Sequence, residues 1–216
     1  MSGEEVKHQM LISSDMVQLA RFRRGAHITW TEIAAPDNEI TNKTNQQITY
    51  HGHDDVPLNS AGFAQLGPVE VYDEEARYQF DFNFFNLLSF TRAIIPHMHK
   101  HQSGVIVLFS SIAGQQTGIG YGLYSAGNFA IDSIVEILSL ELKQFNIRAH
   151  ATEPGLFRTG FLHHRAEGEY FFKSIQDHTG VKEITNADGV QPHGPRKAAK
   201  RIFEVVTEIE AEQGVE

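Results

Sequence analysis

The 216-residue sequence contains no cysteine. Disulfide bonds and thiolate metal sites are therefore excluded. The sequence also has no apolar run approaching the roughly 18 residues that a membrane-spanning helix needs. Its first ten residues, MSGEEVKHQM, lack the apolar core of a secretory signal. We therefore expect a soluble, cytoplasmic protein.

An excess of positive charge is also lacking. Lysine and arginine total 18 residues against 27 aspartates and glutamates, which gives a net charge of -9 and a pI near 5.7. This balance argues against a nucleic-acid-binding protein and against one that binds an anionic membrane surface. The 41% hydrophobic and 21% charged residues are ordinary for a globular protein. The length suits one domain with a sizeable core.

Hydrophobic residues are sparse at the start of the chain. Residues 34–57 are rich in Asn, Thr, Gln and Asp, and such a segment buries too little apolar surface to order a compact structure. We therefore predict an irregular or poorly ordered segment over residues 1–56, with one helix near Asp15–Arg23 that Asp15 caps. Residues 57–216 are predicted to form the folded domain.

From Pro57 onward, helical and strand patterns alternate. Apolar residues at helical spacing predict helices over Asp73–His101, Tyr124–Phe145 and Pro195–Ala211. Between the first two lies GVIVLF, Gly104–Phe109, which has the composition of a buried strand, and a second strand is predicted over Asn146–Pro154. This order predicts an α/β fold with a mostly parallel sheet and flanking helices.

Five short motifs occur in an order and spacing that resemble one family. They are NSAG (59–62), a helix bearing Asn83, VIVLFSSIAG (105–114) with Ser111 after its strand, YSAGN (124–128) and PGLFRT (154–159). Ser111 lies 13 residues before Tyr124, which favours it over Ser110 as the serine of the pattern. Residues 59 to about 210 resemble the short-chain dehydrogenase/reductase (SDR) family, whose sheet is Rossmann-like.

The resemblance implies an NAD(P)-dependent oxidoreductase that interconverts a carbonyl and a secondary alcohol. A tyrosine would give the proton to the carbonyl oxygen, and a serine hydroxyl would hold that oxygen. The implied catalytic residues are Ser111, Tyr124 and Asn83, together with Asn128, which occupies the position of the family's lysine. The implied cofactor-binding residues, for NADP or NAD, are Asn59, Gly62, Tyr124, Asn128, Gly155, Phe157 and Thr159.

Asn128 departs from the family pattern. A lysine one helical turn after the tyrosine would lower the pKa of the phenol from about 10, whereas an amide brings no charge. Tyr124 is therefore expected to keep a pKa near 10. Alcohol oxidation, which needs the phenolate, should suffer more than carbonyl reduction.

A second departure concerns the glycine-rich turn TGxxxGxG, which binds the cofactor pyrophosphate in the family. No segment before Asn59 matches it, so on this interpretation the sheet lacks its first strand and the cofactor binds weakly. The alternative hypothesis is a catalytically dead or truncated family member that acts only through dimerisation or ligand binding.

The resemblance also implies partners. Arg158–Ile184 would close over a small, apolar carbonyl or alcohol substrate, and the two long helices would pair in a homodimer or tetramer. That interface is expected to use Phe84, Phe85, Leu88, Ile131, Ile134 and Leu138. The histidines His97, His99 and His101 need only the dipole at a helix end as explanation, so no metal site is predicted.

Overall fold

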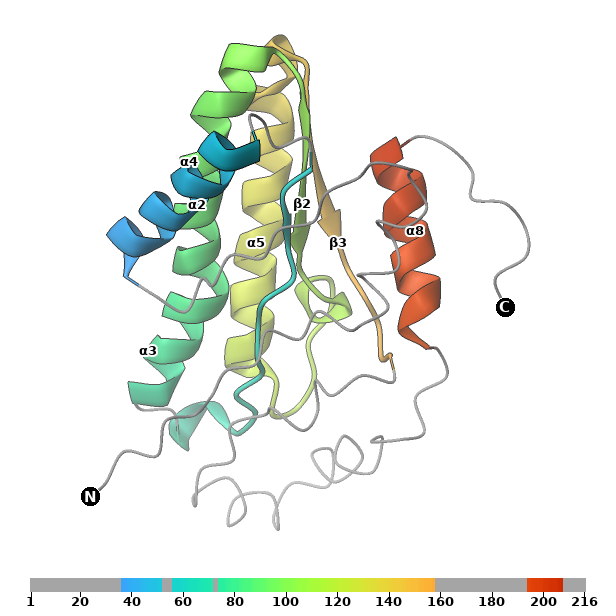
Figure 1. Cartoon of the computed structure of the whole chain (residues 1–216). Helices are drawn as coiled ribbons and strands as arrows, with labels where there is room; N and C mark the ends of the chain where they lie inside the picture. Colours follow the sequence, from blue (N-terminus) through green and yellow to red (C-terminus); the bar gives the residue numbers. More distant parts are fainter. Residues whose placement is uncertain (1–35, 52–55, 72–73, 158–193, 208–216) are drawn as a thin grey trace.

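The computed structural model describes residues 36–51, 56–71, 74–157 and 194–207. Its three strands form one parallel sheet in the order β1 (Leu58–Asn59), β2 (Gly104–Phe109) and β3 (Ile147–Thr152). Helices cover both faces of this sheet, with α2, α4 and α5 on one side and α8 on the other (Figure 1). The predicted α/β fold with a parallel sheet and flanking helices is therefore confirmed.

The two long strands lie where the sequence predicts them. β2 has the predicted bounds, and β3 is slightly shorter than the predicted Asn146–Pro154 because Asn146 adopts a left-handed conformation with φ of 57°. They pair in register from Gly104 with Ile147 to Phe109 with Thr152. The interior of β2 is fully buried, as expected for a strand covered by helices on both faces.

The helix predicted over Asp73–His101 is present, but it contains a wider turn. It comprises α3 (Glu74–Phe80), a π-helical turn η3 (Asp81–Phe85) and α4 (Asn86–His101). Both junctions keep right-handed helical dihedrals, so the three pieces form one continuous rod. π turns within helices are frequent at functional sites, and this one carries Asn83.

The helix α5 (Gly122–Glu141) supplies most of the remaining core. It starts slightly before the predicted Tyr124 and ends at Glu141, after which a short 3-10 turn, η5 (Lys143–Phe145), leads into β3. Apolar side chains of α4, α5, β2 and β3 form one buried cluster. The cluster includes Leu87, Ile94, Met98, Ile106, Leu108, Ile131, Val135, Leu138, Leu142 and Ile147.

The core assignment corrects part of the predicted dimer interface. Ile131 and Leu138 are buried within the chain's own core, so they are not available to a second copy. The apolar side chains that α5 leaves exposed are Phe129, Ile137 and Leu140. Sequence periodicity placed apolar residues on the helix correctly but did not distinguish its inward face from its outward face.

The prediction of an irregular segment over residues 34–57 is wrong for most of this range, because Asp37–His51 form helix α2. Ile40, Thr44 and Ile48 are buried at intervals of one helical turn, and α2 packs against α4. The Nε2 atom of His97 on α4 lies 3.0 Å from Asn45 Oδ1. These few buried side chains are thus enough to pack an otherwise polar helix against α4. The predicted domain boundary at residue 57 stays a prediction.

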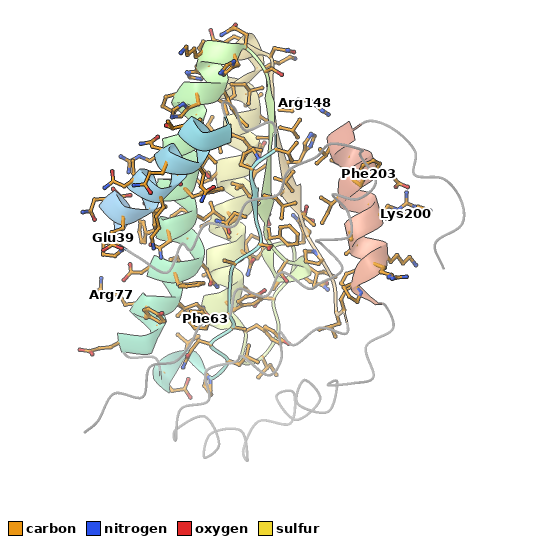
Figure 2. All side chains as sticks on the ribbon, viewed as in Figure 1. Glu39, Phe63, Arg77, Arg148, Lys200 and Phe203 are labelled. Atoms are coloured by element: carbon orange, nitrogen blue, oxygen red, sulfur yellow. The ribbon has the colours of Figure 1, made fainter. Side chains whose placement is uncertain are left out.

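The closing helix α8 (Pro195–Thr207) covers the opposite face of the sheet (Figure 1). Its Ile202 packs with Val105 and Val107 of β2. Arg148, labelled in Figure 2, reaches from β3 to the end of α8, where Nη2 donates to Val206 O at 2.9 Å. The end of the predicted helix, 208–211, and the helix predicted near Asp15–Arg23 lie outside the described residues.

Within the described ranges, no helix has the length and apolar character needed to cross a membrane.

Candidate active site

Ser111 lies just beyond the carboxyl end of β2, where the chain leaves the sheet. Its backbone is extended, and its Oγ accepts a hydrogen bond from the Ala113 N–H at 3.2 Å, which caps the 3-10 turn η4 (Ile112–Gly114). Ser111 is buried, and the Gly114 N–H donates to its carbonyl oxygen at 2.8 Å. The cap therefore fixes the position of the serine side chain.

Tyr124 and Asn128 lie one turn apart near the start of α5. The Asn128 Nδ2 donates to the Tyr124 carbonyl oxygen at 2.8 Å, and Asn128 is only 4% exposed. The side chains of Ser111 and Asn128 also lie close enough to the Tyr124 phenol to lower its pKa as hydrogen-bonding groups. Three of the four predicted catalytic residues are therefore brought together around one phenolic oxygen.

The pKa of Tyr124 differs from the sequence expectation. Burial raises this pKa above the ordinary value of 10.0, while hydrogen bonds from Ser111 and Asn128 lower it by less. The expectation of a pKa near 10 was therefore too low. At neutral pH the phenol is protonated, and so it can donate a proton but cannot accept one.

The Asn83 side chain binds the backbone of the segment after β1. Its side-chain amide is paired with the backbone of Phe63, because Oδ1 accepts from Phe63 N at 3.1 Å and Nδ2 donates to Phe63 O at 2.8 Å. Figure 2 labels Phe63 on the segment after β1, close to the base of α3. Asn83 thus ties this segment to the π turn.

The NSAG segment follows β1 at the same edge of the sheet. Asn59 Oδ1 accepts from the Ala61 N–H at 3.1 Å, which forms a tight turn. A Cβ atom on Gly62 would lie 3.5 Å from Asn83 Oδ1, so this glycine contacts the asparagine side chain. The Asn59 Nδ2 and Ser60 Oγ atoms are buried without a hydrogen-bond partner among the described residues.

The PG segment lies beside the Ser111 turn. The Ile112 N–H donates to Pro154 O at 3.1 Å, and the Ser110 N–H donates to Thr152 O at 2.9 Å. Gly155 is exposed, Phe157 is half-buried, and Thr159 lies outside the described residues. The hydrogen bonds of Thr152 and Pro154 therefore bring the start of the PG segment next to the Ser111 turn.

Two of the three histidines near the end of α4 contact other side chains. His97 contacts Asn45, and the His99 ring stacks on Phe145 with a centroid separation of 3.9 Å. The described part of the chain contains no group of three or more potential metal ligands.

Sequence reasoning did not single out Asp132 and Gly114, which lie next to the site, and it set Ser110 aside in favour of Ser111. The Ser110 hydroxyl donates to Asn128 O at 3.3 Å, and Asp132 lies one further turn along α5. A Cβ atom on Gly114 would lie 2.1 Å from Asp132 Oδ2, so backbone and carboxyl group are in direct contact. The signal in the sequence was the spacing of Tyr124, Asn128 and Asp132 by four residues each, which places them on one helical face.

Comparison with known proteins decides the family. Residues 17–169, well over half of the chain, match the family model described as short chain dehydrogenase. The chain belongs to the short-chain dehydrogenase/reductase family. The match begins far upstream of Asn59, the first residue of the predicted resemblance, and so it includes part of the segment that was predicted to be irregular. The predicted absence of a glycine-rich turn stays a prediction.

Two curated members of the SDR family illustrate the likeness. A 3-ketodihydrosphingosine reductase of Bacteroides thetaiotaomicron is 38% identical over 169 residues, which cover 74% of this chain and 61% of that protein. Human retinol dehydrogenase 8 is 38% identical over 111 residues, which cover 51% of this chain and 36% of that protein. The chain therefore spans less than two thirds of the length of either relative.

Solved structures show the same fold. A short-chain dehydrogenase from Streptomyces avermitilis superposes with a TM-score of 0.68 at 28% identity, covering 87% of this chain and 69% of that one. The structure of ElxO with NADP bound superposes with a TM-score of 0.65 at 20% identity, covering 83% of this chain and 70% of that one.

Proposed function

We propose that this protein is a nicotinamide-dependent carbonyl reductase, which interconverts a carbonyl compound and a secondary alcohol. The observation that carries the proposal is that the Ser111 and Asn128 side chains lie next to the Tyr124 phenol and act on its pKa, in a member of the SDR family. The three side chains converge beyond the carboxyl ends of the strands, where ligands bind in open parallel sheets.

Tyr124 is proposed as the proton donor. A carbonyl oxygen that gains negative charge during reduction needs a nearby acid, and a buried, protonated phenol supplies one. The Ser111 hydroxyl would donate to the same oxygen and stabilise its charge. Asn128 hydrogen-bonds the phenol but brings no positive charge that favours the phenolate. The arrangement therefore favours reduction over alcohol oxidation at neutral pH.

The residues present fit a nicotinamide cofactor, NADP or NAD. Asn59 Nδ2 and Ser60 Oγ are buried polar atoms without a described partner, next to Gly62 in the segment after β1. Unpaired polar atoms at such an edge suit a polar ligand. We propose that Asn59, Gly62, Tyr124 and Asn128 bind the cofactor together with Gly155, Phe157 and Thr159. When bound, the cofactor supplies the hydride.

The substrate is proposed to be a small, apolar carbonyl compound or the corresponding alcohol. Ile112 follows Ser111 directly and is 46% exposed, and Leu156, two residues after Pro154, is 48% exposed. The Ile112 N–H bond to Pro154 O brings these two segments together beside the reacting groups. The names of the two curated relatives, a ketodihydrosphingosine reductase and a retinol dehydrogenase, are consistent with an apolar substrate.

Self-association is also proposed. Phe85 at the end of the π turn is 51% exposed, and Phe129, Ile137 and Leu140 leave further apolar surface on the outer side of α5. A second copy of the chain would bury such side chains.

The test of the proposed function has two steps. NADH and NADPH are first titrated against the purified chain by nicotinamide fluorescence, and their consumption is then followed with long-chain ketones and apolar aldehydes. We expect consumption that depends on the carbonyl compound and is lost in Tyr124→Phe and in Ser111→Ala. Binding of neither cofactor, or equal consumption by wild type and both variants, would refute the proposal and favour a member without catalytic activity.

A further inference from the structure

The carboxyl group of Asp132 lies one helical turn beyond Asn128 on α5, against the turn that follows Ser111. Tyr124, Asn128 and Asp132 follow one another at four-residue intervals along α5, so they share one face of the helix. Tyr124 reaches the Ser111 hydroxyl from this face. Asp132 therefore occupies the position at which the same face meets the turn that follows Ser111.

The contact between Asp132 and that turn is close. A Cβ atom built on Gly114 would lie 2.1 Å from Asp132 Oδ2, 2.7 Å from Ser110 Oγ and 3.2 Å from the backbone carbon of Asn128. No side chain fits between Gly114 and α5. The backbone of η4 thus rests on the Asp132 carboxyl group and on the Ser110 hydroxyl, which itself donates to Asn128 O at 3.3 Å.

The environment of Asp132 disfavours a charged carboxylate. Both oxygens are buried and neither makes a well-formed hydrogen bond with a described residue. Burial raises the pKa of Asp132, the nearby Ser110 hydroxyl lowers it, and the negative charge of Glu153 after β3 raises it further. Ser110 and Gly114 bring no charge, and Glu136, one turn further along α5, is exposed. An unpaired buried charge would be costly, whereas a neutral carboxyl group is tolerated.

We propose that Asp132 is a positioning residue of this site: its carboxyl group supports the packing of the η4 turn against α5 and thereby holds Ser111 close to Tyr124. Ser111 caps η4, and Tyr124 is a residue of α5. The distance between their two hydroxyl groups therefore depends on how η4 packs against α5. Gly114 supplies the matching surface because it has no side chain.

The inference rests on the proposed function in one respect, since the packing of η4 against Asp132 matters to catalysis only if Ser111 and Tyr124 act on one substrate oxygen. A misplacement of about 1 Å can cost about a hundredfold in rate. This packing can be tested without any reaction, because the Ser111 side chain acts on the Tyr124 phenol as a hydrogen-bonding group.

The test uses the full chain labelled with [ζ-13C]tyrosine, whose NMR shift reports hydrogen bonding to each phenol. The Tyr124 resonance is assigned from its loss in Tyr124→Phe, and Ser111→Ala gives the position of the resonance without the serine. We expect Asp132→Ala and Gly114→Ala to move the resonance toward the Ser111→Ala position. Asp132→Asn, which keeps the shape of a neutral carboxyl group, should leave it near the wild-type position.

Two controls accompany these variants. Gly127→Ala adds a methyl group where no described atom lies within 4 Å, and it should leave the Tyr124 resonance unchanged. If Asp132→Ala does not fold, Asp132→Ser replaces it, since its hydroxyl can bond the helix carbonyl one turn back. Should cofactor-dependent reduction be observed, Asp132→Ala should lower kcat about tenfold or more, and much less in a Ser111→Ala background.

The inference would be overturned if the Tyr124 resonance stayed at the wild-type position in Asp132→Ala. It would also be overturned if Ser111→Ala did not move this resonance. Because these readings need no substrate, they hold if the chain reduces no carbonyl compound. Absence of turnover with the expected NMR shifts would count against the proposed function alone.

Discussion

The paired hydrogen bonds between Asn83 and Phe63 predict a large loss of stability in Asn83→Ala. The asparagine is buried in the π turn, and both ends of its amide bond the Phe63 backbone, at 3.1 Å and 2.8 Å. Alanine removes both bonds at once.

The magnitude follows from the loss of partners inside the protein. A buried backbone group that loses its hydrogen bond costs about 1–3 kcal/mol, so the two Phe63 groups together cost about 2–6 kcal/mol. Alanine favours the helix over asparagine by up to about 0.7 kcal/mol, which offsets a small part. Since domains of this kind have about 5–15 kcal/mol in total, the loss is a substantial fraction.

The assay is urea unfolding followed by circular dichroism, with Asn42→Ala as the matched control. Asn42 is an exposed residue of helix α2, so its replacement reports the helix preference of alanine without the buried bonds. We expect Asn83→Ala to lower the free energy of unfolding by at least about 2 kcal/mol relative to this control. A difference below about 0.5 kcal/mol would show that the amide pair does not hold the segment, and the reasoning would fail.

The buried groups of α5 and its exposed surface predict further outcomes. The pKa of Asp132 is raised in the folded state, so its contribution to stability is complete below the unfolded pKa of about 3.9 and is lost as pH rises through the folded pKa. The unfolding free energy of Asp132→Asn minus that of wild type should therefore increase with pH in urea titrations, and a constant difference would contradict this. Because the pKa of Tyr124 is raised, carbonyl reduction should stay constant between about pH 6 and pH 9, and a decline centred near neutrality would argue for a different acid. Asn128→Lys should lower the Tyr124 pKa by about 1–3 units in [ζ-13C]tyrosine titrations, and an unchanged pKa would contradict the proximity of the two side chains. Wild type should scatter light as a dimer or tetramer and Phe85→Ser as a smaller species; a monomeric wild type at micromolar concentration would refute the proposed self-association.

The parallel sheet and its helices could be predicted because their signals are local. GVIVLF is apolar throughout and is bounded by glycine and serine, so its strand was found with the observed bounds. The spacing of Ser111 and Tyr124 picked out two residues that the fold brings together. Helix α2 was missed because its buried stripe is narrow and its composition resembles that of a loop. Packing against α4, which composition does not report, decides its structure.

The electrostatics of the site depended on contacts that the sequence does not contain. The missing lysine was visible at Asn128, but the burial that raises the pKa of Tyr124 was not. Asn83 was found by its motif, whereas its bonds to Phe63 join residues 20 positions apart. The contact of Asp132 with Gly114 likewise joins distant segments, and only the folded chain reveals it.

The most direct test of the proposed reaction is the transfer of deuterium from the cofactor to a carbonyl carbon. NADPH and NADH deuterated at the nicotinamide C4 are incubated with an apolar ketone and the chain, and the alcohol is analysed by mass spectrometry. The account predicts deuterium in the alcohol with wild type, at a rate about 10²–10⁴ times that of Tyr124→Phe. Deuterium transfer at equal rates in both proteins, or none with either cofactor, would contradict it.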